Sequence, residues 1–241
     1  MPFAHNRGES HDDDEVLTST RRDLAQLAAS LRQHLSYQAM IGLEWLPSES
    51  LSVSQTLSES LDEIRVDLGE CIRCRLHTDR TNIVFGEGNP SARIVLVGEG
   101  PGREEDRLGR PFVGPAGKLL DQMISAMGWR RQEVYICNVI KCRPPRNRDP
   151  LPDEIESCGP FLRRQLRAIA PQAILAVGSF AAQFLLSSQQ PISRLRNHVY
   201  QFEGIPVVPT YHPAYLLRNP LQKRQAWKDV QLLLSLLSEE E

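Results

Sequence analysis

A glycine-rich loop follows a short apolar run of the chain and carries residues suited to holding a small ligand. The run Ile94–Val97 predicts a buried strand bounded by turn residues, and the segment after it reads GEGPGREED. Its glycines bring bare backbone close to a ligand. Open α/β sheets place ligands in loops at the carboxyl ends of their strands. We therefore expect a binding site here, with Phe112 of the following GRPFVGPAG segment among its members.

Two other interpretations of this loop are weaker. A dinucleotide-binding fingerprint needs G-x-G-x-x-G, but Arg103 stands at the third glycine position, and the acidic residues after it would repel a pyrophosphate. A purely structural turn would account for the glycines, but not for the carboxylates and the aromatic residue beside them.

Four cysteines form a second group that could do chemistry. Cys71 and Cys74 make a C-x-x-C pair in a basic loop, and Cys142 and Cys158 flank an arginine- and proline-rich segment. Four thiolates from two segments can hold a zinc ion or a 4Fe-4S cluster. The wide spacing of the second pair favours the cluster. A redox C-x-x-C pair normally opens a helix after a strand, whereas this pair follows a helix. Cys137, inside an apolar strand, is interpreted as an ordinary buried thiol.

Two further polar residues are expected at strand ends. Asn138 ends the run VYICN, and its amide can both donate and accept a hydrogen bond, so it can read the edge of a base or another amide. His212 follows the strand that ends near Pro209, and the proline after it holds it in an extended conformation. Each residue alone is more often structural. Together with Glu99 they place three candidate site residues on one rim of the predicted sheet.

The elements that must position these residues alternate between strand and helix patterns. Strands are expected at 93–97, 133–138, 172–177, 198–203 and 205–209, and helices at 116–127, 153–169, 179–187 and 221–237. This alternation predicts an α/β fold in which an open, mostly parallel sheet is flanked by helices on both faces. Residues 1–68 are expected to form an accessory acidic arm, partly disordered, with a helix over 15–36. Residues 69–241 are expected to form the main domain.

Charge is distributed unevenly along the chain. Residues 1–70 carry 5 basic and 13 acidic side chains, whereas residues 71–150 carry 14 basic and 9 acidic ones, a balance of +5. The segment with the ligand loop is therefore the electropositive one, which suits a polyanionic partner. We find no run of eighteen apolar residues and no apolar signal core, and these observations predict a cytoplasmic protein without a membrane span. An odd number of cysteines in such a chain favours metal binding over disulfides.

Taken together, these motifs resemble the family 4 uracil-DNA glycosylases, the iron–sulfur members of their superfamily. The resemblance covers about Gly69 to Leu237 and rests on GEGPGREED, GRPFVGPAG, NVIKCRPPRNR and HPAYLLR, plus the cysteine spacing. It implies the three-layer fold of that superfamily, a 4Fe-4S cluster, uracil-containing DNA as the partner and a monomeric protein.

The resemblance also implies a role for each motif residue. Cys71, Cys74, Cys142 and Cys158 would bind the cluster; Glu99, Gly100, Pro101, Phe112, Asn138 and His212 would bind the flipped uracil; Glu105 and His212 would be catalytic; Leu216 and Arg218 would contact DNA. Phe112 would stack on the base, Asn138 would read its Watson–Crick edge and His212 would face its O2. Leu216 would be a wedge in the vacated stack. The sequence departs from the family pattern at Cys137 and Arg103, neither of which is a proposed site residue.

The chemistry expected of this set is hydrolysis of the N-glycosidic bond of an extruded uracil, which leaves an abasic site. Donors at O2 would stabilise the departing anion, and a carboxylate would stabilise the cationic sugar. Among the four nearby carboxylates Glu105 is preferred. The alternatives are a relative that traps uracil-DNA covalently through a histidine inserted after NVIK, where this chain continues as CRPPRNRDP, and a non-catalytic DNA-binding module.

Overall fold

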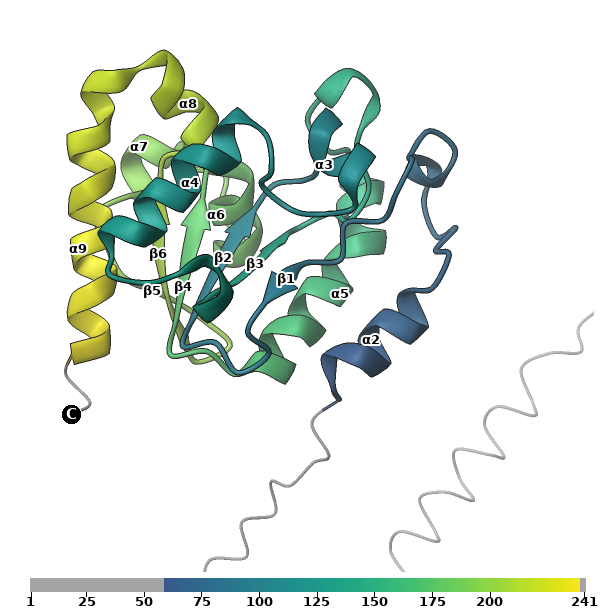
Figure 1. The fold of residues 1–241 in the computed structure, drawn as a ribbon, viewed down its shortest axis with the longest axis horizontal. Coiled ribbons are helices and arrows are strands. Elements are labelled where there is room, and N and C mark those ends of the chain that lie inside the picture. Colours follow the sequence, from purple (N-terminus) through teal and green to yellow (C-terminus); the bar gives the residue numbers. More distant parts are fainter. Residues whose placement is uncertain (1–58, 239–241) are drawn as a thin grey trace, which may run out of the picture. The chain divides into compact units, whose positions relative to one another are not determined.

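The centre of the molecule is a six-stranded sheet in the order β1-β3-β2-β4-β6-β5 (Figure 1). The computed structural model describes residues 59–238. The strands are β1 (Glu87–Gly88), β2 (Ile94–Gly98), β3 (Tyr135–Asn138), β4 (Ala173–Val177), β5 (Tyr200–Phe202) and β6 (Ile205–Thr210). The four inner strands pair in parallel, and β1 and β5 close the edges antiparallel. The predicted open, mostly parallel sheet is confirmed.

Helices follow the strands at the expected places. They are α2 (Leu61–Leu68), α3 (Arg103–Leu108), α4 (Pro115–Ala126), α5 (Pro152–Ile169), α6 (Ser179–Leu186), α7 (Ile192–Leu195), α8 (Pro213–Arg218) and α9 (Lys223–Ser238), with short 3₁₀ turns η1 (Arg75–His77), η2 (Arg131–Glu133), η3 (Pro145–Asn147) and η4 (Pro220–Gln222). The four predicted helices of the main domain correspond to α4, α5, α6 and α9. Helices α3, α7 and α8 were not predicted, because four to six residues show too few turns of periodicity. The sequence indicated a helix before Cys71 without giving its bounds, and α2 lies there. The helix expected at 15–36 lies outside the described residues.

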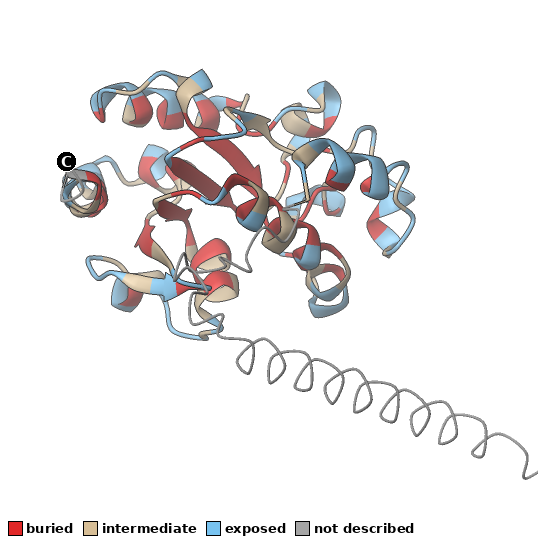
Figure 2. Cartoon of the chain, turned by 90° about the horizontal axis from the view of Figure 1, so that it is seen from below, coloured by how far each residue is buried: buried red, intermediate tan, exposed pale blue. Residues whose placement is uncertain are grey.

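The sheet separates two hydrophobic cores. Val95 and Val97 of β2 face a core formed with α5 and α6, whereas Ile94 and Leu96 face a second core formed with α4 and α9. This alternation follows from the period of two along a strand. Every residue of β2, β3 and β4 is buried, and these strands form the buried middle layer in Figure 2. The result is a three-layer α/β/α arrangement, as the resemblance implied.

The order of the strands creates one topological switch point. The chain passes from β2 to β3 on one side of it, and then crosses to β4 and β6 on the other. At such a point the loops leaving neighbouring strands diverge and leave a crevice at the carboxyl ends. The loops after β2, β3 and β6 all leave the sheet at these ends.

Helix α2 lies within the segment predicted as the N-terminal arm. Its buried residues Ile64 and Leu68 pack with Phe85 and Phe161, the latter from α5. Arg164 of α5 forms ion pairs with the carboxylates of Glu59 and Asp67 at the two ends of α2. The division into arm and domain stays a prediction. Among residues 59–238, no helix has the length and apolar character that crossing a membrane requires.

Candidate functional site

A cavity of about 590 Å³ opens at the carboxyl ends of β2, β3 and β6. Residues from separate segments of the chain line it, and the first and last of them, Glu99 and Arg218, are more than a hundred positions apart in sequence. Its lining includes Glu99, Gly100, Pro101, Glu105, Phe112, Asn138, His212 and Arg218. All of the residues predicted to bind or act on the base therefore line one cavity, together with one of the two predicted DNA contacts.

Phe112 forms an aromatic wall of this cavity. The residue is buried, and its backbone has a positive φ of 49°, a conformation that residues other than glycine rarely adopt. Two features hold it there. The main-chain N–H groups of Val113 and Gly114 both donate to Oε1 of Glu105 at 2.9 Å. Gly117 passes so close that an added Cβ would lie 1.9 Å from the Phe112 carbonyl oxygen. Strain retained in this way is typical of functional sites.

Asn138 ends β3 and is almost completely buried, with 1 % of its surface exposed. Its Oδ1 is enclosed, yet no donor from the described part of the chain lies within hydrogen-bond distance. Gly98 at the end of β2 makes room for it, since a Cβ there would lie 2.4 Å from Asn138 Oδ1 and 2.5 Å from Phe112 Cζ. Buried polar atoms are nearly always paired, so an unpaired amide oxygen beside a cavity indicates a ligand that supplies the donor.

His212 presents one definite nitrogen to the cavity. The residue is the N-cap of α8 in the extended conformation that the following proline predicts, with ψ of 137°. Its Nδ1 accepts from the main-chain N–H of Ala214 at 3.1 Å. Desolvation, reinforced by Arg218, lowers the pKa of His212 to about 4. The ring is therefore neutral at physiological pH, and because Nδ1 is an acceptor, the proton is on Nε2.

The turn before His212 is fixed from α9. Thr210, the last residue of β6, donates its hydroxyl to Oδ2 of the buried Asp229 at 2.9 Å. The guanidinium of Arg196 pairs with the same carboxylate at 2.8 Å and lies 5.0 Å from the ring of Tyr211. A buried carboxylate with a full set of donors fixes the geometry of the strand end.

The three carboxylates of the acidic run after β2 have different partners. Asp106 is buried and accepts from the main-chain N–H groups of Thr81 and Asn82, so it is structural. Glu104 pairs with Arg107 at 3.0 Å. Glu105 lines the cavity, and one of its oxygens carries the loop of Phe112.

Glu99 lies in the cavity wall, and its carboxyl group has a raised pKa. Desolvation, with a smaller contribution from Asp149, raises its pKa to about 7. Titratable groups with such shifts are concentrated at functional sites. At neutral pH this carboxyl group is close to half ionised.

Several other residues line the cavity that were not assigned a role from the sequence. Asn147, Arg148 and Asp149 come from the η3 turn and the segment that follows it. The guanidinium of Arg148 forms a paired contact with the fully buried carboxylate of Glu154 at 2.8 and 2.5 Å. The arginine-rich composition of this segment was the only sequence signal for a binding role. Composition does not show which of its side chains line the cavity.

The two predicted DNA contacts are placed differently. Arg218 lies at the rim of the cavity, but Leu216 is only 1 % exposed and packs against Leu119 and Ala226. The prediction that Leu216 is the wedge is therefore corrected, because in this structure its side chain is held in the core and does not reach a duplex. The exposed leucines of the same region are Leu217, at 44 %, and Leu221, at 92 %.

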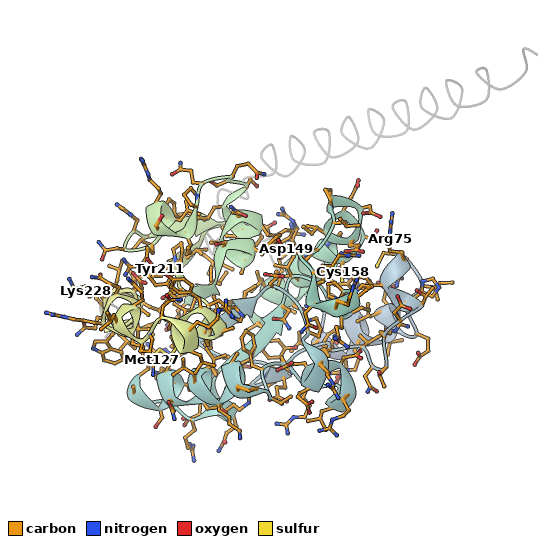
Figure 3. All side chains as sticks on the ribbon, turned by 90° about the horizontal axis from the view of Figure 1, so that it is seen from above. Arg75, Met127, Asp149, Cys158, Tyr211 and Lys228 are labelled. Atoms are coloured by element: carbon orange, nitrogen blue, oxygen red, sulfur yellow. The ribbon has the colours of Figure 1, made fainter. Side chains whose placement is uncertain are left out.

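The four predicted cluster cysteines come from three parts of the chain. Cys142 and Cys158 are buried, and Cys71 and Cys74 are half-buried. Burial raises the pKa of the Cys142 thiol, and the nearby charges of Cys74 and Cys71 contribute less. Burial raises the pKa of Cys158 to about 12, which is unsuited to a redox thiol. Figure 3 shows Cys158 on the Arg75 side of the molecule, with Asp149 between it and Tyr211 in that view.

Two of these sulfurs, those of Cys142 and Cys158, accept hydrogen bonds. Arg80 donates from Nη1 to Cys142 Sγ at 3.5 Å and to the main-chain oxygen of Cys71 at 2.5 Å, and its side chain is 9 % exposed. The main-chain N–H of Lys141 donates to Cys158 Sγ at 3.2 Å. Within residues 59–238 no three His, Cys, Asp or Glu side chains stand close enough to share one metal ion. Cys137 is fully buried in the core, as interpreted from the sequence.

Comparison with known proteins identifies the family of this chain. The family model described as the uracil DNA glycosylase superfamily matches residues 85–231. The fold and the site thus define a member of the uracil DNA glycosylase superfamily, to which this chain belongs.

Individual relatives narrow this assignment. A type-4 uracil-DNA glycosylase of Archaeoglobus fulgidus is 49 % identical over 179 residues, covering 71 % of this chain and 90 % of the relative. One of Thermotoga maritima is 49 % identical over 166 residues, covering 68 % and 86 %. A type-5 uracil-DNA glycosylase of Pyrobaculum aerophilum is 30 % identical over 149 residues, covering 55 % and 66 %. The two type-4 proteins are thus more similar to this chain than the type-5 protein is.

Proposed function

We propose that this protein is a uracil-DNA glycosylase that removes uracil from DNA and leaves an abasic site. The observation that carries the proposal is the shared cavity in which Phe112, Asn138 and His212 meet, with Oδ1 of Asn138 buried and unpaired. A base can reach this cavity only after rotating out of the helix, which costs a few kcal/mol. Stacking on Phe112 would offset about 1–3 kcal/mol of this cost.

Recognition of uracil follows from the amide of Asn138. Its oxygen would accept from N3–H of uracil, and its NH₂ group would donate to O4. Cytosine presents an acceptor and a donor in the same places, so two buried polar groups would be left unpaired. Mismatched buried hydrogen bonds give the strong form of discrimination.

Hydrolysis breaks the bond between C1′ of the sugar and N1 of uracil, with the bonding electrons leaving on the base. His212 would donate from Nε2–H to O2 of the departing anion; one such donor contributes about 3–4 kcal/mol. Because the imidazole is neutral, it stabilises the anion without first protonating it. Water then adds its oxygen to C1′, and its proton is released. The carboxylate of Glu105 faces this cavity and would stabilise the cationic sugar.

We also propose that Cys71, Cys74, Cys142 and Cys158 hold a 4Fe-4S cluster. Four thiols, two of them buried and accepting hydrogen bonds from the guanidinium of Arg80 and the main-chain N–H of Lys141, fit a group that needs four thiolates and carries negative charge. The wide cysteine spacing supports a cluster over zinc, since each thiolate binds a different iron atom. When bound, the cluster supplies cross-links between the segments that carry its ligands.

The DNA contacts proposed here are Arg218 at the rim of the cavity and the exposed Leu217 close to it. Arg218 would contact phosphate, and Leu217 replaces Leu216 as the wedge. A cytoplasmic location and a monomeric state stay predictions.

The test uses a purified, iron-loaded protein and oligonucleotides with a single uracil. Alkali cleaves the strand wherever the base has been removed. We expect cleavage by the unchanged protein and by Lys228→Met, an exposed change on α9, and strong losses in Asn138→Ala and His212→Ala. An intact protein that leaves the uracil strand uncut would refute the glycosylase. Iron, sulfide and visible absorbance measured on the same sample test the cluster, and stoichiometric zinc would refute it.

A further inference from the structure

A fully buried lysine stands between the cysteine site and the base pocket. Lys141 directly precedes Cys142, and 0 % of its surface is exposed. Its Nζ donates to the main-chain oxygen of Asn138 at 2.7 Å and to Oε1 of Gln165 at 2.6 Å. Both acceptors are neutral oxygens. Burying an amino group is unfavourable unless its hydrogen bonds are made, so an apolar residue of similar volume would occupy this space at lower cost.

The second acceptor is itself held rigidly. Gln165 on α5 is fully buried, and its Nε2 donates to the main-chain oxygen of Phe85 at 2.9 Å and lies 3.3 Å from the hydroxyl of Tyr135. These contacts turn Oε1 of Gln165 toward Lys141. The lysine is therefore directed by α5, the same helix that carries Cys158.

The first acceptor belongs to the residue expected to read the base. Asn138 is the last residue of β3, where the strand pairing with β2 ends. Its carbonyl oxygen is held by Lys141, while its side-chain oxygen is the unpaired atom in the cavity wall. At the end of a strand, the peptide orientation that the carbonyl contact fixes also fixes the direction of Cα–Cβ, and hence of the amide.

The main chain of the same lysine reaches the cysteine site. Its N–H donates to Cys158 Sγ at 3.2 Å, and its carbonyl oxygen accepts from the N–H of Val84 at 2.8 Å. One residue thus contacts both a proposed cluster ligand and the base-reading residue.

We propose that Lys141 is the positioning residue of Asn138, and that it couples the order of the cysteine site to recognition of uracil in the pocket. This inference rests on the proposed glycosylase function. It assigns a structural reason for placing the cysteine site next to the base pocket: the segment of residues 138–142 ends at Cys142, a proposed cluster ligand, and the side chain of Lys141 reaches back to its first residue, Asn138.

The test removes the Nζ donor of Lys141 and keeps the volume of the side chain. Lys141→Met should weaken inhibition of excision by free uracil about tenfold or more, and slow single-turnover excision at least about tenfold, because the amide loses its direction. Affinity for a duplex with an abasic site should stay within about twofold, since phosphate contacts are unaffected. Visible absorbance per protein should stay unchanged. Lys228→Met is the matched control.

A second pair of variants tests the same contact from the other side. Gln165→Glu keeps an oxygen that accepts from Lys141, so inhibition by uracil should stay close to that of the unchanged protein even if the melting temperature falls. Gln165→Met removes the acceptor and should behave like Lys141→Met. If Gln165 served stability alone, Gln165→Glu would not retain inhibition by uracil while its melting temperature fell. This pair of variants tests the inference if Lys141→Met does not fold.

Two results would overturn the inference. One is a Lys141→Met protein with a lower melting temperature but unchanged inhibition by uracil. The other is a variant that loses its visible absorbance together with excision, because Lys141 would then serve the cysteine site and not the amide. A failure of the proposed function is recognised separately, since the unchanged protein would then neither excise uracil nor bind it.

Discussion

The ring centroids of Phe112 and His212 lie 5.7 Å apart, and the planes are inclined by 31°. One ring comes from the loop after β2 and the other from the loop after β6, a hundred residues later in the chain. A base that stacks on Phe112 therefore brings one of its edges to His212. This relationship makes stacking and stabilisation of the leaving group parts of a single binding event.

Replacing Phe112 tests the stacking contact. We expect Phe112→Ala to lower kcat/KM for uracil excision about 5- to 150-fold, which corresponds to the 1–3 kcal/mol of a base–aromatic stack. Phe112→Leu keeps apolar volume without a ring face and should fall between. Single-turnover rates, with melting temperatures as the control for folding, make the comparison. Equal rates in all three proteins would contradict a stacking role.

Glu105 offers a matched pair of substitutions. Its Oε1 accepts from Val113 and Gly114 and so holds the loop that carries Phe112. Glu105→Gln retains an oxygen at this place and loses only the charge, whereas Glu105→Ala loses both. We expect the alanine variant to be slower than the glutamine variant by about tenfold, the worth of one to two buried hydrogen bonds. Equal losses would show that anchoring of the loop contributes nothing to the rate.

The low pKa of His212 predicts how excision depends on pH. The ring binds a proton only near pH 4, well below the usual value of 6.5. Its Nε2–H donor is therefore present throughout the range from about pH 5.5 to 8, and the rate should show no histidine step there. The profile is best measured in Glu99→Gln, which removes the carboxyl group that titrates near pH 7. A step near pH 6.5 that His212→Gln abolishes would contradict the neutral-imidazole assignment.

Glu99 should make stability depend on pH in the opposite sense from a paired carboxylate. Its pKa rises from 4.5 to about 7 in the folded protein, so the folded state binds more protons than the unfolded state between these values. Stability is then lost as pH rises through 7. Glu99→Gln should be more stable than the unchanged protein by about 1–3 kcal/mol at pH 8, and the difference should shrink toward pH 5.

Thermal unfolding at the two pH values measures this effect. Asp149→Asn is the control, because it removes the smaller contribution to the raised pKa and keeps the carboxyl group of Glu99. A stability difference that is the same at both pH values would show that Glu99 does not titrate in this range.

The neighbouring leucines of α8 should have separate effects. Leu216 is buried with Leu119, so Leu216→Ala should lower the free energy of unfolding by about 2–5 kcal/mol. Leu217 is exposed, so Leu217→Ala should leave stability within about 0.5 kcal/mol and slow excision from duplex DNA more than from single strands. Denaturant unfolding and paired assays on the two substrates measure this. A larger duplex defect in a folded Leu216→Ala protein would restore the original prediction of the wedge.

The sequence alone determined the alternation of elements, because buried parallel strands read as apolar runs and the helices α4, α5 and α9 span 12, 18 and 16 residues, long enough to show a period. It also identified the candidate base-binding residues, since glycines, a carboxylate, an amide and a histidine after predicted strands are few. These signals are local, so they can be recognised in the sequence without knowledge of the fold.

The tertiary structure decided what these residues touch. Burial of Leu216 against α4, the anchoring of Phe112 by Glu105, the tautomer of His212 and the contact of Lys141 with Asn138 all depend on segments that are distant in sequence or on the exact direction of a side chain. Pattern and composition fix which face of an element is apolar, but close packing between elements fixes direction and distance, and these set the pKa values and hydrogen bonds of the site.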